Sequence, residues 1–96
     1  MKTYRQQLII TSDQPEQFLN LSYEVEECVR RSLITDGLCV VYSQHTTSAV
    51  FLENDREELY SDWSKMLGKI VPHESDYKVD YSSAGAAHMK QMLLGA

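Results

Sequence analysis

Apolar and polar residues alternate near the start of the chain, which is the spacing of half-buried β-strands. Residues 3–11 follow this alternation imperfectly, and a polar stretch that ends at Pro15 interrupts it. Residues 16–20 indicate a second short strand. We therefore expect two short strands before the first helix.

The strongest strand signal lies in residues 38–53. Two apolar runs, 38–42 and 49–52, flank the polar connection 43–47. Because both alternating faces of these runs are apolar, the pattern predicts a buried β-hairpin.

Two segments repeat apolar residues every three or four positions, the spacing of one helix face. The first begins near Ser22, a candidate N-cap, and is expected to end at Asp36–Gly37. The second follows Asn54, whose spacing to Glu57 resembles a capping box, and should stop before Pro72.

A third helix is predicted over residues 84–94, with Gly95 as its C-terminal cap. Before it, Tyr77, Val79 and Tyr81 alternate as in a short strand. The order of these elements predicts an α+β fold, in which helices cover an antiparallel sheet or sandwich.

Composition bounds the class of protein. The 96 residues are 43% hydrophobic and 24% charged, which is typical of one globular domain, and we expect a single domain over 1–96. A net charge of −5 and scattered basic residues disfavour nucleic-acid binding, and the short apolar runs disfavour a membrane partner.

Cys28 and Cys39 are interpreted as reduced core residues. The N-terminus has no apolar signal core, so we expect a cytoplasmic protein.

His45 is the first candidate for chemistry. Its imidazole can transfer protons or bind a metal near neutral pH, and the hydroxyls of Thr46 and Thr47 can donate hydrogen bonds to phosphate oxygens. The alternative is a polar turn whose hydroxyls satisfy the backbone.

Glu53 and His88 are the other candidates. Glu53 is a candidate base or metal ligand, although a carboxylate before a helix also favours the helix N-terminus. His88 follows a run of small residues, 84–87, which allows close approach of backbone or ligand; the alternative is an ordinary boundary residue. No two histidines are three or four residues apart, so a metal site has to be assembled from distant residues.

Several short motifs occur in a fixed order between Gly37 and Gly95: Gln44-His45-Thr46-Thr47, Glu53-Asn54, Asp62, Val71-Pro72, Tyr77, Asp80-Tyr81, His88-Met89-Lys90 and Leu94-Gly95. Together they resemble the YjbQ-like family, also called secondary thiamine-phosphate synthase.

The resemblance implies an α+β fold built around an antiparallel β-sandwich, a homotrimer, and a pocket with two prominent histidines. Carried over, the catalytic candidates are His45, Glu53 and His88; the substrate-binding candidates are Thr46, Thr47 and Asp80; and the metal-ligand candidates, for zinc or magnesium, are His45 and His88. The implied activity is that of a transferase that joins the pyrimidine and thiazole halves of thiamine phosphate.

Four departures from the family pattern affect how far these residue roles can be carried over from the family to this chain. Val79 stands where a histidine is usual, and residues 83–85 lack the usual Asp or Asn. The spacing from His45 to Glu53 is one residue short, and the glycine-rich C-terminal strands are absent. Three hypotheses follow: an enzyme acting on a phosphorylated small molecule, a non-catalytic relative that serves as a ligand-binding or oligomeric domain, or a structural domain with no ligand.

Overall fold

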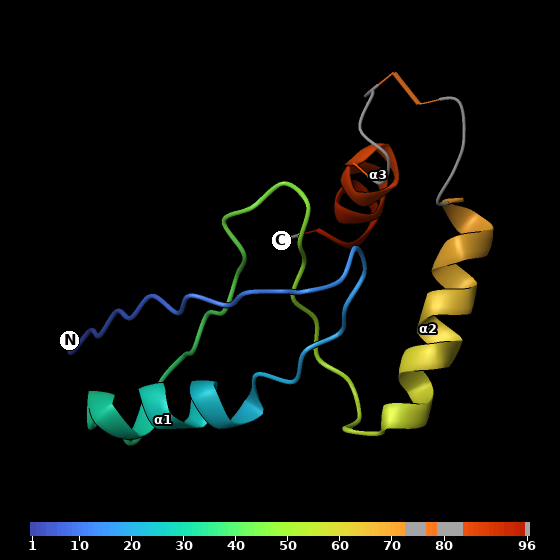
Figure 1. Cartoon of the computed structure of the whole chain (residues 1–96). Helices are drawn as coiled ribbons and strands as arrows, with labels where there is room; N and C mark the ends of the chain where they lie inside the picture. The colour runs from blue at the N-terminus through green and yellow to red at the C-terminus, as the bar shows by residue number, and fades with distance from the viewer. Residues whose placement is uncertain (73–76, 79–83, 96) are drawn as a thin grey trace. The chain divides into compact units, whose positions relative to one another are not determined.

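The computed structural model describes residues 1–72, 77–78 and 84–95 and contains three helices in this part of the chain (Figure 1). They are α1 (Ser22–Ser32), α2 (Glu57–Ile70) and α3 (Ala84–Leu94). The chain divides into two compact units, Met1–Val40 and Val41–Ala96, so that α1 belongs to the first and the other two helices to the second. The single domain over 1–96 stays a prediction.

Helix α1 is held at both ends by polar side chains close in sequence. The side-chain oxygen of Asn20 accepts a hydrogen bond of 2.9 Å from the Ser22 N–H, and the buried Ser32 hydroxyl donates to the carbonyl of Val29 at 2.6 Å. Leu33 then adopts a left-handed conformation with φ of 59°, which ends the helix. The helix was predicted, but it ends before Asp36–Gly37.

Helix α2 confirms the predicted apolar stripe and the stop before Pro72. The last turn is closed by the N–H of Val71, which donates to the carbonyl of Leu67 at 2.7 Å. The predicted capping box is wrong: the N-cap is Arg56, which makes no side-chain capping bond, while the N–H of Asn54 donates to Glu53.

Helix α3 has the predicted bounds. Gly95 follows it with φ of +84°, a conformation that glycine adopts without strain, and its N–H donates to the carbonyl of Gln91 at 2.8 Å. Gly85 and Ala86 are buried, which explains why the helix begins with small residues.

The prediction of an antiparallel β-sandwich is wrong for this structure. No strand occurs in the ranges 1–72, 77–78 and 84–95, so neither the strands at 3–11 and 16–20 nor the hairpin at 38–53 forms. An isolated two-stranded hairpin is marginal in water unless an apolar face is covered. Here that cover is missing, since Leu38 and Leu52 are 92% and 98% exposed.

One residue of the apolar run 49–52, the second half of the expected hairpin, packs instead against a helix. The ring of Phe51 meets Trp63 of α2 edge to face, with centroids 5.3 Å apart, and Tyr60 lies 5.4 Å from the same indole. This aromatic contact ties the segment before α2 to the helix without any backbone pairing.

Cys28 and Cys39 form no disulfide with each other; Cys28 is half-buried and Cys39 exposed, so the prediction that both are core residues is wrong. None of the helices formed by the described residues has the length and hydropathy needed to cross a bilayer.

Candidate functional site

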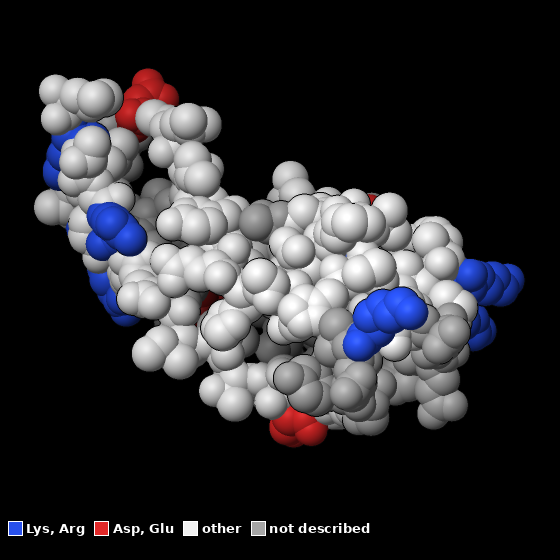
Figure 2. Space-filling view, turned by 90° about the horizontal axis from the view of Figure 1, so that it is seen from above, with Lys and Arg blue, Asp and Glu red and all other residues white. Residues whose placement is uncertain are grey.

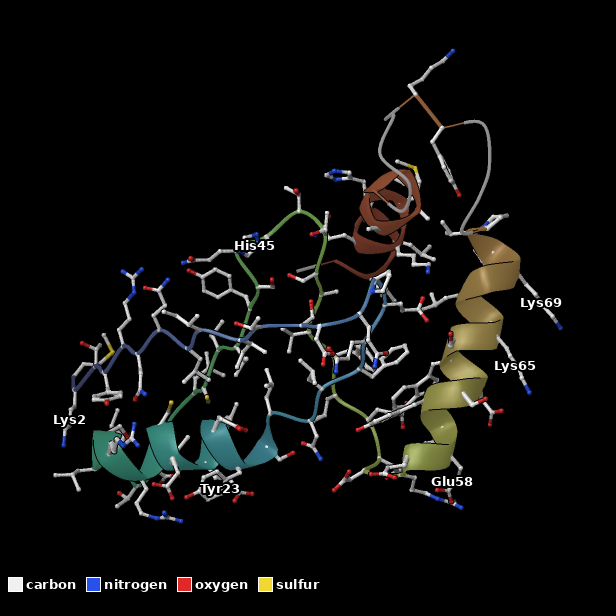
Figure 3. The ribbon with its side chains drawn as sticks, viewed as in Figure 1. Lys2, Tyr23, His45, Glu58, Lys65 and Lys69 are labelled. Carbon is white, nitrogen blue, oxygen red and sulfur yellow. The ribbon has the colours of Figure 1, made fainter. Side chains whose placement is uncertain are left out.

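The candidate site is built on a turn at residues 45–47, inside the unit Val41–Ala96. The side chains of His45, Thr46 and Thr47 are all exposed, and Figure 3 shows His45 on the loop between α1 and α2. Three adjacent hydrogen-bonding side chains are therefore accessible to a ligand from solvent.

Two serines close this turn. The hydroxyls of Ser43 and Ser48 are hydrogen-bonded to each other, and the N–H of His45 donates to the Ser43 hydroxyl oxygen at 3.3 Å. The sequence pattern predicted no role for Ser48 and placed Ser43 only in the polar connection 43–47. The available signal was a hydroxyl residue on each side of the His-Thr-Thr triplet.

Glu53 is exposed and bonded locally. Its carboxylate accepts a hydrogen bond of 3.0 Å from the N–H of Asn54, the next residue. One carboxylate oxygen is thus engaged by the backbone before α2 begins, while the other can accept a further hydrogen bond.

His88 is half-buried on α3, one turn after Gly85. The small residues that precede it do allow a close approach, but the group that approaches is Tyr77. A Cβ built on Gly85 would lie 2.5 Å from the Cβ of Tyr77 and 2.6 Å from its Cγ, so this position has room only for glycine.

Tyr77 also reaches the end of α2. Its hydroxyl donates to the carbonyl oxygen of Pro72 at 2.6 Å. The same ring borders an open, mostly apolar hollow of about 410 Å³, together with the end of α2 and three residues of α3. Those three are Met89, Met92 and Leu93, whose spacing of three and four residues from Met89 places them on one face of the helix.

The predicted site residues do not form one connected cluster in the described structure. No hydrogen bond or ion pair joins His45, Glu53 and His88 there, and Asp80, Val79 and His73 lie outside the described residues. The catalytic roles and the role of Asp80 stay predictions.

The candidate metal ligands are His45 and His88, which were carried over from the family resemblance, and Glu53, which was a further candidate. In residues 1–72, 77–78 and 84–95, no three His, Cys, Asp or Glu side chains come together in a way that could hold a metal ion. Zinc usually takes three or four protein ligands, so this part of the chain does not supply a complete set. We therefore derive no step that uses a metal, and zinc or magnesium stays a prediction.

Charged side chains are frequent along α2, which carries Glu57, Glu58, Asp62, Lys65 and Lys69. Figure 2 shows a face on which most atoms belong to neither basic nor acidic residues. At the start of α2, where Figure 3 labels Glu58, the Arg56 guanidinium donates two hydrogen bonds to the Glu58 carboxylate, at 2.7 and 3.1 Å. The bonds from Arg56 and a bond from the backbone N–H of Glu58 lower the pKa of this carboxyl.

Comparison with known proteins decides the family. A family model described as "UPF0047 protein YjbQ-like" matches residues 6–96, nearly the whole chain. The chain belongs to the YjbQ-like UPF0047 family. The resemblance deduced from the His-Thr-Thr series is thereby confirmed.

Curated YjbQ-like relatives come from archaea and bacteria. A UPF0047 protein of Archaeoglobus fulgidus is 35% identical over 80 residues, which are 82% of this chain and 61% of the relative. A UPF0047 protein of Methanothermobacter thermautotrophicus is 29% identical over 96 residues, covering 99% and 67%. UPF0047 protein YugU of Bacillus subtilis is 27% identical over 90 residues, covering 93% and 68%.

The alignment therefore spans less than two thirds of the Archaeoglobus relative and about two thirds of the others. The names of these relatives state no substrate, cofactor or reaction. No solved structure matches the chain significantly.

Proposed function

We propose that this YjbQ-like chain binds a phosphorylated small molecule at the turn 45–47 and takes part in chemistry of the thiamine-phosphate synthase type. The observation that carries the proposal is the exposed turn, in which one imidazole and two hydroxyls lie on adjacent residues and are open to solvent. The family match supports the proposal because it covers residues 6–96, which include this triplet.

The ligand class follows from the donors. Hydroxyls of Thr46 and Thr47 donate to phosphate oxygens, and the ring N–H of His45 adds a further donor. The chain carries a net charge of −5, so attraction of an anion has to come from such local donors.

The proposed reaction is a substitution. The ring nitrogen of a thiazole phosphate attacks the methylene carbon of a pyrimidine diphosphate, so that a C–N bond forms while the C–O bond to pyrophosphate breaks. The two electrons of that bond leave with pyrophosphate, and the thiazole becomes a cationic thiazolium. Donors on the leaving oxygens stabilise the charge that develops there.

Within this proposal each residue has one task. His45 donates a proton or hydrogen bond to the departing pyrophosphate, and Thr46 and Thr47 hold its oxygens. Glu53 and His88 act as further acid–base groups, and Asp80 binds substrate.

Calorimetric titration tests the proposal. Pyrophosphate is added to the wild type, to His45→Ala and to His45→Gln, with Lys69→Ala as a control for loss of a charge on α2. We expect saturable binding by the wild type, a loss of about tenfold or more in affinity for both His45 variants, and no change for the control. A wild type that does not bind pyrophosphate contradicts the proposed function.

A second candidate function is that of an oligomeric structural domain. The specific observation in its favour is the number of large apolar side chains that stay exposed outside the helices, such as Ile9, Leu38 and Leu52. Burial of such side chains between chains would be favourable, and a homo-oligomer, with a trimer favoured, is the form we propose.

A further inference from the structure

We infer that Ser43 and Ser48 are positioning residues, whose paired hydroxyls hold the turn 45–47 in one shape before a phosphate binds. The inference rests on the function proposed above, because it concerns the same turn. It adds two residues that neither the motif series nor the family match singles out.

The hydrogen bonds define the arrangement. Ser43 and Ser48 stand five positions apart, one on each side of the triplet, and their hydroxyl oxygens are bonded directly. The Ser43 oxygen also accepts the N–H of His45. A hydroxyl has one donor and two acceptor positions, so Ser43 can make both bonds at once.

The two bonds act on different parts of the turn. The bond between the serines joins the beginning of the turn to its end. The bond to the His45 N–H fixes the peptide of the residue that carries the imidazole. Ser43 therefore takes part in two contacts and Ser48 in one, which predicts effects of unequal size.

Such closure matters here because regular structure is missing on both sides. The described residues from 34 to 56 contain no helix or strand, so no backbone ladder holds residues 45–47. An unordered loop loses conformational entropy when it binds a ligand, whereas a loop already closed loses less. The hydroxyl pair thus favours binding without touching the ligand.

Both serines lie in a loop, so the loss of a hydroxyl should change the turn and not the folding of the helices. Ser43 is half-buried and Ser48 exposed, and neither belongs to α2, which begins at Glu57. Removal of either hydroxyl should therefore leave the helices intact.

The experiment compares five proteins: the wild type, Ser43→Ala, Ser48→Ala, Ser48→Thr and Ser61→Ala. The last removes an exposed hydroxyl from α2 and serves as a matched control. Pyrophosphate affinity is measured by calorimetry, hydrogen exchange of the His45 amide by NMR, and helix content by circular dichroism.

We expect pyrophosphate affinity to fall about threefold in Ser48→Ala and about tenfold in Ser43→Ala, from the usual net strength of one and two hydrogen bonds. Amide exchange at His45 should be faster in Ser43→Ala. Ser48→Thr restores the hydroxyl and should bind like the wild type, as should Ser61→Ala.

Two outcomes separate this inference from the proposed function. If the wild type binds pyrophosphate and both alanine variants bind it with the wild-type affinity, the positioning role is overturned and the proposed function stands. If the wild type does not bind, the proposed function itself is overturned, and the positioning role with it. Failure of Ser48→Thr to recover wild-type affinity also overturns the role of the hydroxyl pair.

Discussion

At the scale of single residues, the ion pair at the start of α2 is the best-defined electrostatic contact in the described chain. Two guanidinium nitrogens of Arg56 donate to one oxygen of Glu58, and they lower the pKa of that carboxyl. Glu58 also lies in the first turn, where a negative charge is favoured by the helix dipole.

Replacing Arg56 with alanine should raise the pKa of Glu58 towards its usual range, because the largest cause of the depression is removed. A depressed pKa in the folded state means that Glu58 adds stability above its unfolded pKa and that this is lost as the pH falls through the folded value. The side chain is fully exposed, so salt should weaken the effect.

NMR titration of the Glu58 carboxyl carbon, in low and in high salt, measures the shift. Lys69→Ala removes a cation from the last turn of the same helix and should leave the titration unchanged. An unchanged titration curve in Arg56→Ala would show that the ion pair is not formed in solution.

The candidate site shows how far single residues can be predicted. His45, Thr46 and Thr47 were predicted from their polarity between two apolar runs; they are exposed, and their role in binding stays a prediction. Ser43 and Ser48 were missed because their importance depends on a contact between the two hydroxyls, which sequence spacing alone does not reveal.

At the scale of elements, Tyr77 connects the end of α2 with the beginning of α3. Its ring lies against the backbone of Gly85, and its hydroxyl is bonded to the carbonyl of Pro72. The small residues that open α3 thus accommodate an aromatic ring of the same chain.

Gly85→Ala should lower the free energy of unfolding by about 1–2 kcal/mol, since the clash with Tyr77 outweighs the better helix propensity of alanine. Gly68→Ala is the matched control. Nothing lies within 4 Å of a Cβ at Gly68, so that variant should gain up to about 1 kcal/mol. Urea unfolding of both variants gives the comparison.

A double-mutant cycle identifies the cause. In a Tyr77→Gly background both the ring and the Cβ that lies 2.5 Å from the added methyl group are gone, so Gly85→Ala should no longer destabilise the protein. If Gly85→Ala lowers the free energy of unfolding by the same amount with and without the Tyr77 side chain, the contact between Tyr77 and Gly85 is not the cause of the destabilisation.

Elements also differ in how well the sequence predicts them. All three helices were predicted, α3 with its bounds, because an α-helix bonds each residue to one four positions away. The strands at 3–11, 16–20 and 38–53 were wrong, because alternation describes one chain segment whereas a strand also needs a paired neighbour.

At the scale of the whole molecule, the exposed apolar residues are the dominant feature. Leu38 and Leu52 expose nearly their entire side chains, and burying each one at an interface would contribute about 1.5–3 kcal/mol. We therefore expect the chain to form the proposed homo-oligomer, with a trimer favoured.

Sedimentation equilibrium should show a species heavier than the monomer, and replacing Leu38 and Leu52 with lysine should shift it towards the monomer. Lysines at the exposed polar positions Ser12 and Ser61 add the same charge without removing apolar surface and should leave the mass unchanged. A wild type that is monomeric at every concentration argues against the oligomeric domain.

The sequence by itself determined the three helices, the chemistry available at the turn 45–47 and membership of the YjbQ-like family, because these depend on residues close together in the chain or on their order. Only the tertiary structure decided that the apolar runs stay unpaired, that Ser43 meets Ser48 and that Tyr77 lies on Gly85. Each of these depends on which partner a group finds once the chain has folded, and local periodicity contains no information about that choice.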